Sequence, residues 1–233
     1  MATDPRKRQK QLARKAAKRK APVTSRKQST HIAGELRGAH HMAVAAQAPL
    51  LECLRGEELF ETGMGTVIVS RAMPNGAVGM ASFLLDVFCL GVKNADFVVV
   101  PRDEYQFRLA HIGAHEHLIP IAPADARKLV EDAEAYARNL GFSPHADYQL
   151  ARRILADIDA SECHTNFVFG QNGKPFYVVG PYDTPQRVCH ILDTLSRRCG
   201  PDGFHYVVVE SDSAGWLADE QEDIIEAEYR RLR

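Results

Sequence analysis

The sequence lacks the motifs that identify the common enzyme classes. It contains no phosphate-binding P-loop, no GxGxxG after a strand, no GxSxG and no HExxH. Its five cysteines, Cys53, Cys89, Cys163, Cys189 and Cys199, form no CxxC pair and are odd in number. In a chain of this size they indicate reduced thiols, which excludes a disulfide framework and favours a cytoplasmic protein.

Long hydrophobic runs are also missing. The longest one, residues 77–92, is interrupted by Asp86 and is shorter than the roughly 20 residues that a membrane-spanning helix needs. We therefore expect no membrane partner. Of the 233 residues, 45% are hydrophobic and 25% are charged, which are ordinary values for a folded globular protein.

The two signs of charge are separated along the chain, although the formal net charge is only −1. Residues 1–27 contain eleven Lys or Arg against a single acid, Asp4, so their formal charge is +10 and that of residues 28–233 is −11. Such asymmetry is typical of an interaction tail. The basic residues are Arg6, Lys7, Arg8, Lys10, Arg14, Lys15, Lys18, Arg19, Lys20, Arg26 and Lys27.

This basic arm, residues 1–29, predicts a nucleic-acid partner. Apart from Met1, Leu12 and Val23 are its only large apolar residues, so we expect it to be disordered. Dense Lys and Arg supply the sequence-independent part of phosphate binding. We therefore predict an association with RNA or a ribonucleoprotein, in which the body, residues 30–233, makes the specific contact. In the alternative, the arm folds back onto its own acidic surface, because residues 200–229 hold nine acids and no Lys or Arg.

The pattern of the body predicts an α+β fold of β-hairpins and a helix pair. Two β-rich runs, 66–72 and 78–88, are joined by Pro74-Asn75-Gly76, which favours a tight turn. A short strand at 97–100 follows, and an amphipathic helix covers 125–140 and ends at Gly141. Before these elements we expect a helix around 36–46 and a helical turn near 57–61.

The second half is predicted to have similar elements, although no sequence repeat indicates a duplication. A helix opens at Ser143-Pro144 and is followed by a hairpin of strands 166–169 and 175–179, which turns at 171–173. A helix at 185–198 and a strand at 204–209 come next, and an acidic helix at 216–232 offers a surface for a protein partner. The body is predicted to be one domain with possible substructure at 30–120 and 121–233.

One candidate metal or catalytic site is the histidine cluster. His111, His115 and His117 lie within seven residues, with Glu116 between them as a further ligand or a base. Neutral imidazoles at this spacing can share a divalent metal, which would suit a metal-dependent hydrolase. The alternative, which we favour, is a polar loop between Phe107 and the helix that begins at Asp125.

The second candidate is Asp86, which stands alone among apolar residues. A buried carboxylate needs a partner or a metal, because an unpaired charge is unstable in the protein interior. Asp86 is therefore a candidate metal ligand or general base. It could equally pair with Lys93 or an arginine, or point to solvent. No cofactor is predicted, and a divalent metal is left open.

Two further features have structural explanations. In the dipeptides Cys163-His164 and Cys189-His190, neighbouring side chains point apart, and Cys189 is predicted to lie in the core. The loop 180–186 enters a helix N-terminus, where Asp183 or Thr184 is predicted to be the N-cap.

Overall fold

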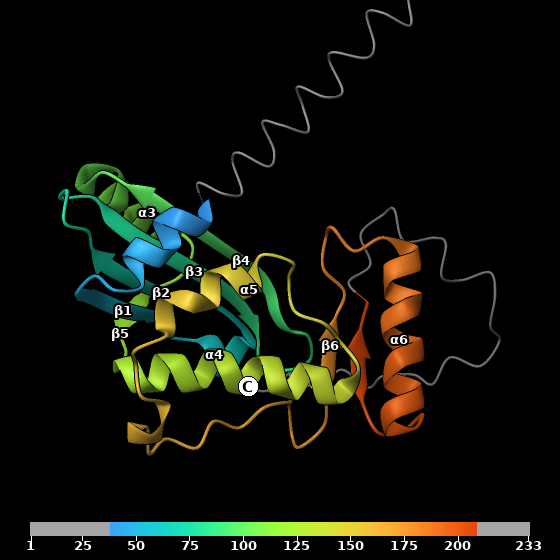
Figure 1. The fold of residues 1–233 in the computed structure, drawn as a ribbon. Coiled ribbons are helices and arrows are strands. Elements are labelled where there is room, and N and C mark those ends of the chain that lie inside the picture. The colour runs from blue at the N-terminus through green and yellow to red at the C-terminus, as the bar shows by residue number, and fades with distance from the viewer. Residues whose placement is uncertain (1–37, 209–233) are drawn as a thin grey trace, which may run out of the picture.

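A five-stranded antiparallel sheet forms the centre of the computed structural model, which describes residues 38–208 (Figure 1). Its strand order is β4-β3-β2-β1-β5, so sequence neighbours pair directly, except that β5 returns beside β1. The strands are β1 (Leu50–Gly56), β2 (Met64–Ala72), β3 (Val78–Asp86), β4 (Gly91–Val100) and β5 (Leu118–Pro120).

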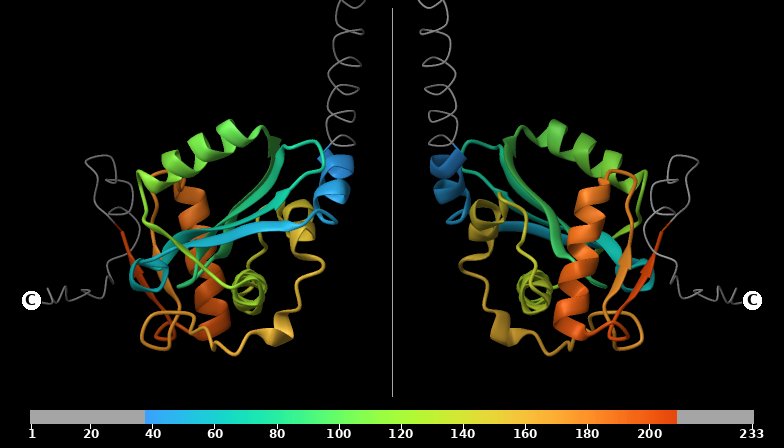
Figure 2. Two further views of the ribbon diagram at one scale, coloured as in Figure 1. Left: turned by 90° about the vertical axis from the view of Figure 1, so that its left-hand side faces the viewer. Right: turned by 90° about the vertical axis from the view of Figure 1, so that its right-hand side faces the viewer.

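Helices lie on both faces of this sheet (Figure 2). One face carries α3, and the other carries α4 and the α5–η1 segment. Residues 38–45 form a further helix before β1. The helical elements after β1 are α2 (Leu59–Thr62), α3 (Arg102–Gly113), α4 (Pro123–Leu140), α5 (Tyr148–Ala151), η1 (Arg152–Leu155), η2 (Ala160–Glu162) and α6 (Pro185–Cys199).

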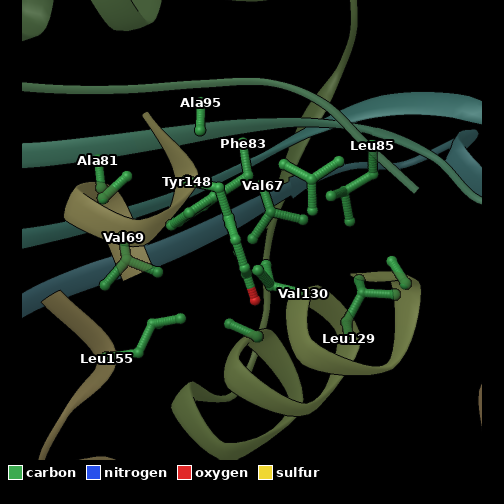
Figure 3. Close-up of a cluster of buried hydrophobic side chains, with 14 of the residues drawn as sticks. Val67, Val69, Ala81, Phe83, Leu85, Ala95, Leu129, Val130, Tyr148 and Leu155 are labelled. Carbon is green, nitrogen blue, oxygen red and sulfur yellow. The ribbon is translucent and has the colours of Figure 1, made fainter. Parts of the chain in front are cut away.

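Strand alternation divides the apolar side chains between the two faces. On the face that carries α4, Val67 and Phe83 pack with Leu129 and Tyr148 in the main core (Figure 3). This cluster contains residues from both of the segments 30–120 and 121–233 that the sequence analysis distinguished. On the face that carries α3, Ile68 packs with Tyr105 of this helix. A one-residue slip in register would exchange these two sets, so the pattern fixes the pairing of the strands.

A separate cluster joins α6 to the end of the sheet. Here Cys89 and Leu90, in the turn between β3 and β4, pack against Tyr177 and the inner side of α6. Tyr177 belongs to β6 (Phe176–Val178), which pairs in parallel with β7 (His205–Val207). The β3–β4 turn is therefore the point where the main sheet meets the C-terminal elements.

The α+β prediction is confirmed, and so are its most regular elements. The hairpin of β2 and β3 turns at Pro74-Asn75-Gly76, with the Gly76 N–H donating to the Met73 carbonyl at 3.0 Å. Helix α4 covers the predicted range and ends at Gly141, whose φ of +97° is the left-handed C-terminal cap. Helix α6 also follows its predicted range closely.

Several elements with weak patterns were not predicted. Strands β1 and β5 and helix α3 have no counterpart in the sequence prediction, and Tyr105 is the only buried residue of α3. Strand β4 begins at Gly91 rather than at residue 97. Its first half was not predicted because residues 93, 94 and 96 are polar and interrupt the β-rich pattern. The helix expected from Ser143 begins only at Tyr148, as the short helix α5, and continues as the 3-10 helix η1.

The predicted second hairpin was wrong. Asn172 and Gly173, with φ of +53° and +78°, do form the turn, but only the bridge from Gln171 to Lys174 flanks it. Strand β6 pairs instead with the distant β7, because the Phe167 and Phe169 side chains pack on other elements and residues 166–169 form no strand. The basic arm and the predicted acidic helix at 216–232 lie outside the described residues.

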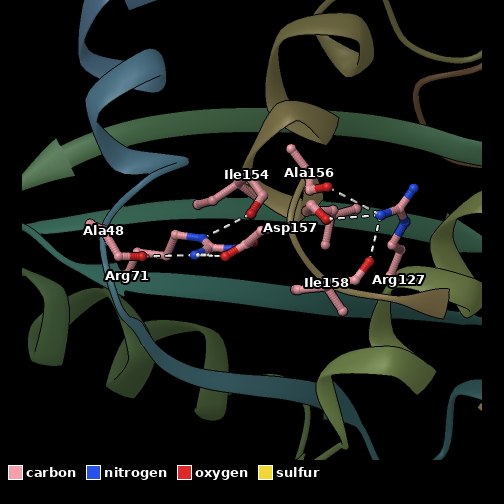
Figure 4. A network of polar contacts seen from close by, with 8 residues as sticks. Ala48, Arg71, Arg127, Ile154, Ala156, Asp157 and Ile158 are labelled. Atoms are coloured by element: carbon pink, nitrogen blue, oxygen red, sulfur yellow. Dashed lines mark hydrogen bonds and ion pairs between the residues drawn. The ribbon is translucent and has the colours of Figure 1, made fainter. Parts of the chain in front are cut away.

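A buried arginine ties β2 to two other segments (Figure 4). The Arg71 side chain is only 1% exposed and is surrounded by acceptors. Its Nε donates to the Ile154 carbonyl at 2.9 Å and its Nη1 to the Ala48 carbonyl at 2.7 Å. The Asp157 carboxylate completes the set. Arg127 of α4 binds carbonyls of the same segment, those of Leu155, Ala156 and Ile158.

Replacing this guanidinium should destabilise the fold. In Arg71→Met the buried Ile154 and Ala48 carbonyls lose their donors, so we expect a loss of about 2–5 kcal/mol in urea unfolding. Asp157→Asn is the matched variant. The amide oxygen of this variant can still accept from the guanidinium, and the Asp157 side chain is 62% exposed, so we expect a smaller loss than in Arg71→Met. Equal losses of unfolding free energy in the two variants would show that the ion pair, and not the hydrogen bonds to the two carbonyls, stabilises this junction.

Two glycines allow backbone strain to be separated from packing. Gly76 and Gly91 have φ of +80° and +65°, but a Cβ at Gly76 would meet nothing within 4 Å. At Gly91 it would lie 2.5 Å from the Ala133 carbonyl oxygen and 2.6 Å from Ala137 Cβ. We expect Gly76→Ala to lower the free energy of unfolding by about 1–2 kcal/mol. Gly91→Ala should lose roughly a further 1–3 kcal/mol through overpacking against α4. Equal losses in thermal or urea unfolding would contradict the close contact.

Candidate functional site

Asp86 lies buried at the end of β3 and caps the following turn. Its Oδ1 accepts hydrogen bonds from the backbone N–H groups of Phe88 at 3.1 Å and Cys89 at 2.8 Å. Burial raises its pKa to about 6, against the opposing effects of the Cys89 N–H and the Lys93 charge. The carboxylate is thus engaged by backbone groups, which gives it a structural task at the junction between β3 and β4.

The three histidines of the cluster have different surroundings. His111 lies in α3 and lines a cavity of about 290 Å³ with Asp96 and Phe107. Its ring is 5.5 Å from that of His115. His117 lies in the turn after the helix, where its Nδ1 is 2.7 Å from Glu57 Oε2. Within residues 38–208, no three His, Cys, Asp or Glu side chains come together in a metal-binding group.

The Glu116 carboxylate accepts a hydrogen bond from β2 just beyond the point where the pairing of β1 with β2 ends. Both of its oxygens accept from the Thr66 N–H of β2, at 3.2 and 3.0 Å. The carboxylate lies over Gly56, where an added Cβ would come within 2.3 Å of Oε2. A larger residue at position 56 would therefore displace it. As with Asp86, a carboxylate that the sequence offers for catalysis is engaged by the backbone.

The two Cys-His dipeptides also lie apart from any cluster of three ligands. Cys163 is buried near the start of α4, but Cys189 is exposed, so its prediction as a core residue was wrong. Its neighbour Val188 takes the inward position of α6. Thr184 is the N-cap of α6, and its Oγ1 accepts from the Arg187 N–H at 3.3 Å. Asp183 accepts from the Gly180 N–H and from the Tyr177 hydroxyl, both at 2.9 Å.

A cavity of about 620 Å³ lies beside β1 and the start of α4. Cavities of about 300–1,000 Å³ are the usual size for small-molecule ligands. Its walls combine three phenyl rings with a cation, a carboxylate and an amide, and we call it the aromatic cavity. The residues that give it this character are Arg55, Phe60, Phe88, Asp125, Asn166 and Phe167.

The polar groups of the aromatic cavity are held by local contacts. Arg55 Nη1 donates to the carbonyls of Gly56 at 2.8 Å and Glu57 at 2.9 Å, which orients the guanidinium. Asp125, in the first turn of α4, accepts from the Thr165 hydroxyl at 3.3 Å. One side of the cavity can thus donate hydrogen bonds and another can accept them. This arrangement suits a ligand with an apolar, planar part and polar groups of both kinds.

Sequence reasoning could not find this cavity, since its residues come from five segments. Arg55 belongs to β1, Phe60 to α2 and Asp125 to α4, while Phe88 and Phe167 lie in connecting segments. Phe60 and Phe167 are more than 100 residues apart, yet their rings are parallel with centroids 5.7 Å apart. None of these positions belongs to a recognisable motif.

Comparison of the chain with protein-family models, with curated proteins and with solved structures gave no match. Among residues 38–208, no helix combines the length and the apolar character that a membrane crossing requires. The function has to be inferred from charge and geometry.

Replacing Asp86 should separate its hydrogen bonds from its charge. The amide oxygen of Asp86→Asn can still accept from Phe88 and Cys89, so at pH 7 we expect the stability to change by less than about 1 kcal/mol. Asp86→Ala leaves two buried N–H groups without an acceptor and should lose about 1–3 kcal/mol.

The pH dependence follows from the raised pKa. Because the pKa of about 6 in the folded protein lies above the ordinary value of 3.8, protonation of Asp86 favours the folded state. Wild type should therefore gain stability relative to Asp86→Asn, on the order of 2 kcal/mol, as the pH falls from 7 to 4. Urea unfolding of both proteins at the two pH values measures this. A relative loss on acidification would mean that the two N–H groups outweigh burial.

Proposed function

We propose that the protein binds RNA or a ribonucleoprotein through the basic arm. The observation that carries the proposal is the segregation of charge, with eleven Lys or Arg and one acid in residues 1–27 of a chain whose remainder is acidic. When Lys and Arg neutralise the phosphates of a nucleic acid, the counterions condensed on it are released, and this release drives binding without sequence specificity. A cytoplasmic location, which the free cysteines favour, would give the arm access to RNA.

The ion pairs of the body support assigning this role to the arm. Residues 38–208 contain fourteen Lys or Arg and twenty Asp or Glu. Half of these fourteen cations already lie within 4 Å of a carboxylate, which reduces their availability for phosphate. The paired cations are Arg71, Arg108, Arg127, Lys128, Arg138, Arg152 and Arg187.

The arm supplies charge but no base recognition. It contains no aromatic residue on which a base could stack. Discrimination between sequences, where it exists, must come from the body. The proposal therefore assigns affinity to the arm and any selectivity to residues 30–233.

Deleting residues 1–27 should abolish most of the affinity while leaving the fold intact. The deletion takes the formal charge from −1 to −11 and removes no described residue. We expect an almost unchanged melting temperature. In fluorescence anisotropy with a labelled 20-nucleotide RNA, the full chain should lose affinity steeply with salt, with a slope of roughly 0.7 per neutralised phosphate on logarithmic axes.

Two full-length controls separate charge from sequence. Replacing the eleven Lys and Arg with Gln should act like the deletion, whereas shuffling residues 2–27 should preserve binding, because the composition is unchanged. Binding that survives both the deletion and 0.5 M salt would place recognition in the body. No binding by the full chain at low salt would instead favour the arm that folds back onto acidic residues.

A further inference from the structure

Two phenyl rings that line the aromatic cavity form a fixed apolar part of its wall. Phe60 and Phe167 stack with an interplanar angle of 1°, and both rings are partly buried against the main core. Lys128 lies over the Phe167 ring, 5.6 Å from its centroid. The two rings are therefore packed in place before any ligand arrives. Such a surface favours a planar π-system, because stacking on a fixed ring loses little conformational entropy.

Arg55 provides hydrogen-bond donors at the same cavity. Its Nη1 is bound to the Gly56 and Glu57 carbonyls. The N–H groups on Nε and Nη2 form no hydrogen bond with residues 38–208. A guanidinium held in this way recognises an anionic oxygen group such as phosphate or carboxylate.

Asp125 requires the ligand to offer a hydrogen-bond donor. An ionised carboxylate only accepts hydrogen bonds and has about four accepting sites, of which the Thr165 hydroxyl uses one. A ligand that is anionic throughout would be repelled here. A ligand that carries an amino group beside its ring would be bound, as the exocyclic amine of cytosine is by Asp or Glu.

We propose that the aromatic cavity binds a single nucleotide whose base carries an exocyclic amino group. The base lies against the phenyl rings of the cavity wall, its amino group donates to Asp125, and its phosphate accepts from Arg55. Adenine, cytosine and guanine meet this requirement, whereas uracil has no amino group. The inference rests on the proposed function, since the nucleotide is a unit of the nucleic acid that the arm holds. It adds the base selectivity that the arm cannot supply.

Calorimetric titration of the full chain with 5′-AMP, CMP, GMP and UMP tests this, in 0.2 M NaCl to weaken contacts with the arm. We expect the amino-bearing nucleotides to bind about tenfold or more tightly than UMP, the factor that one good hydrogen bond supplies. Each side chain then accounts for one part of the ligand. Asp125→Asn should reduce binding of AMP and CMP and leave UMP unchanged. Arg55→Gln should weaken AMP but not adenosine.

Phe167→Leu keeps an apolar side chain but removes the ring, so all four nucleotides should weaken by about tenfold. The matched control is Phe107→Leu, which changes a phenyl ring that is 72% exposed on α3, outside the aromatic cavity. Circular dichroism of every variant establishes that it is folded. Equal binding of the four nucleotides, or losses in the Phe107 variant that match those in the Phe167 variant, would overturn the proposal.

The two proposals fail in different ways. If no mononucleotide binds but RNA binding still depends on the arm and on salt, the arm proposal stands and the cavity proposal falls. If the deletion of residues 1–27 leaves RNA binding unchanged while AMP still requires Asp125 and Phe167, the arm proposal falls and the cavity proposal stands.

Discussion

A buried guanidinium on the central strand β2 constrains much of the fold. Arg71 cannot lose its charge, so the folded chain must surround it with acceptors. These come from Ala48, after the first helix, and from Ile154 and Asp157, after α5. Three distant parts of the sequence are thereby fixed at one point. Arg127 of α4 holds the same segment from its other side, and the chain then passes from residue 158 to the aromatic cavity, of which Phe167 forms one wall.

Two carboxylates near strand ends accept hydrogen bonds from backbone N–H groups, whereas Arg71 donates to backbone carbonyls. Where β3 ends, Asp86 accepts from the N–H groups of the turn, and where β1 ends, Glu116 accepts from the N–H that β1 leaves unpaired on β2. Buried backbone groups need partners, and a side-chain carboxylate can replace a missing strand. This explains why Asp86 can stand among apolar neighbours in the sequence, and why Glu116, which lies between two histidines, is turned toward the backbone of β2.

The sequence predicted the elements whose patterns are set locally. Helix α4 has an apolar stripe and a C-terminal glycine, and the β2–β3 turn has Asn-Gly, so short-range chemistry decides both. Helix α3 has only Tyr105 fully buried, and β6 finds its partner β7 almost 30 residues later in the chain. Such features depend on tertiary contacts. The aromatic cavity is the extreme case, since Phe60, Asp125 and Phe167 acquire a common role only when the chain is folded.

The same ion pairs that stabilise the described part of the body also define what it can bind. Arg138 pairs with Glu134 and Arg187 with Asp183, so the surface of α4 and the start of α6 offer few uncompensated cations to phosphate. A polyanion would approach such a body only if another segment supplied the attraction, and the basic arm has the required charge. Arg55 differs from these paired cations, since backbone carbonyls hold it without neutralising its charge. Under the two proposals, Arg55, which forms no ion pair within residues 38–208, and the partly buried rings beside it distinguish one nucleotide from the next, while the arm attracts the strand.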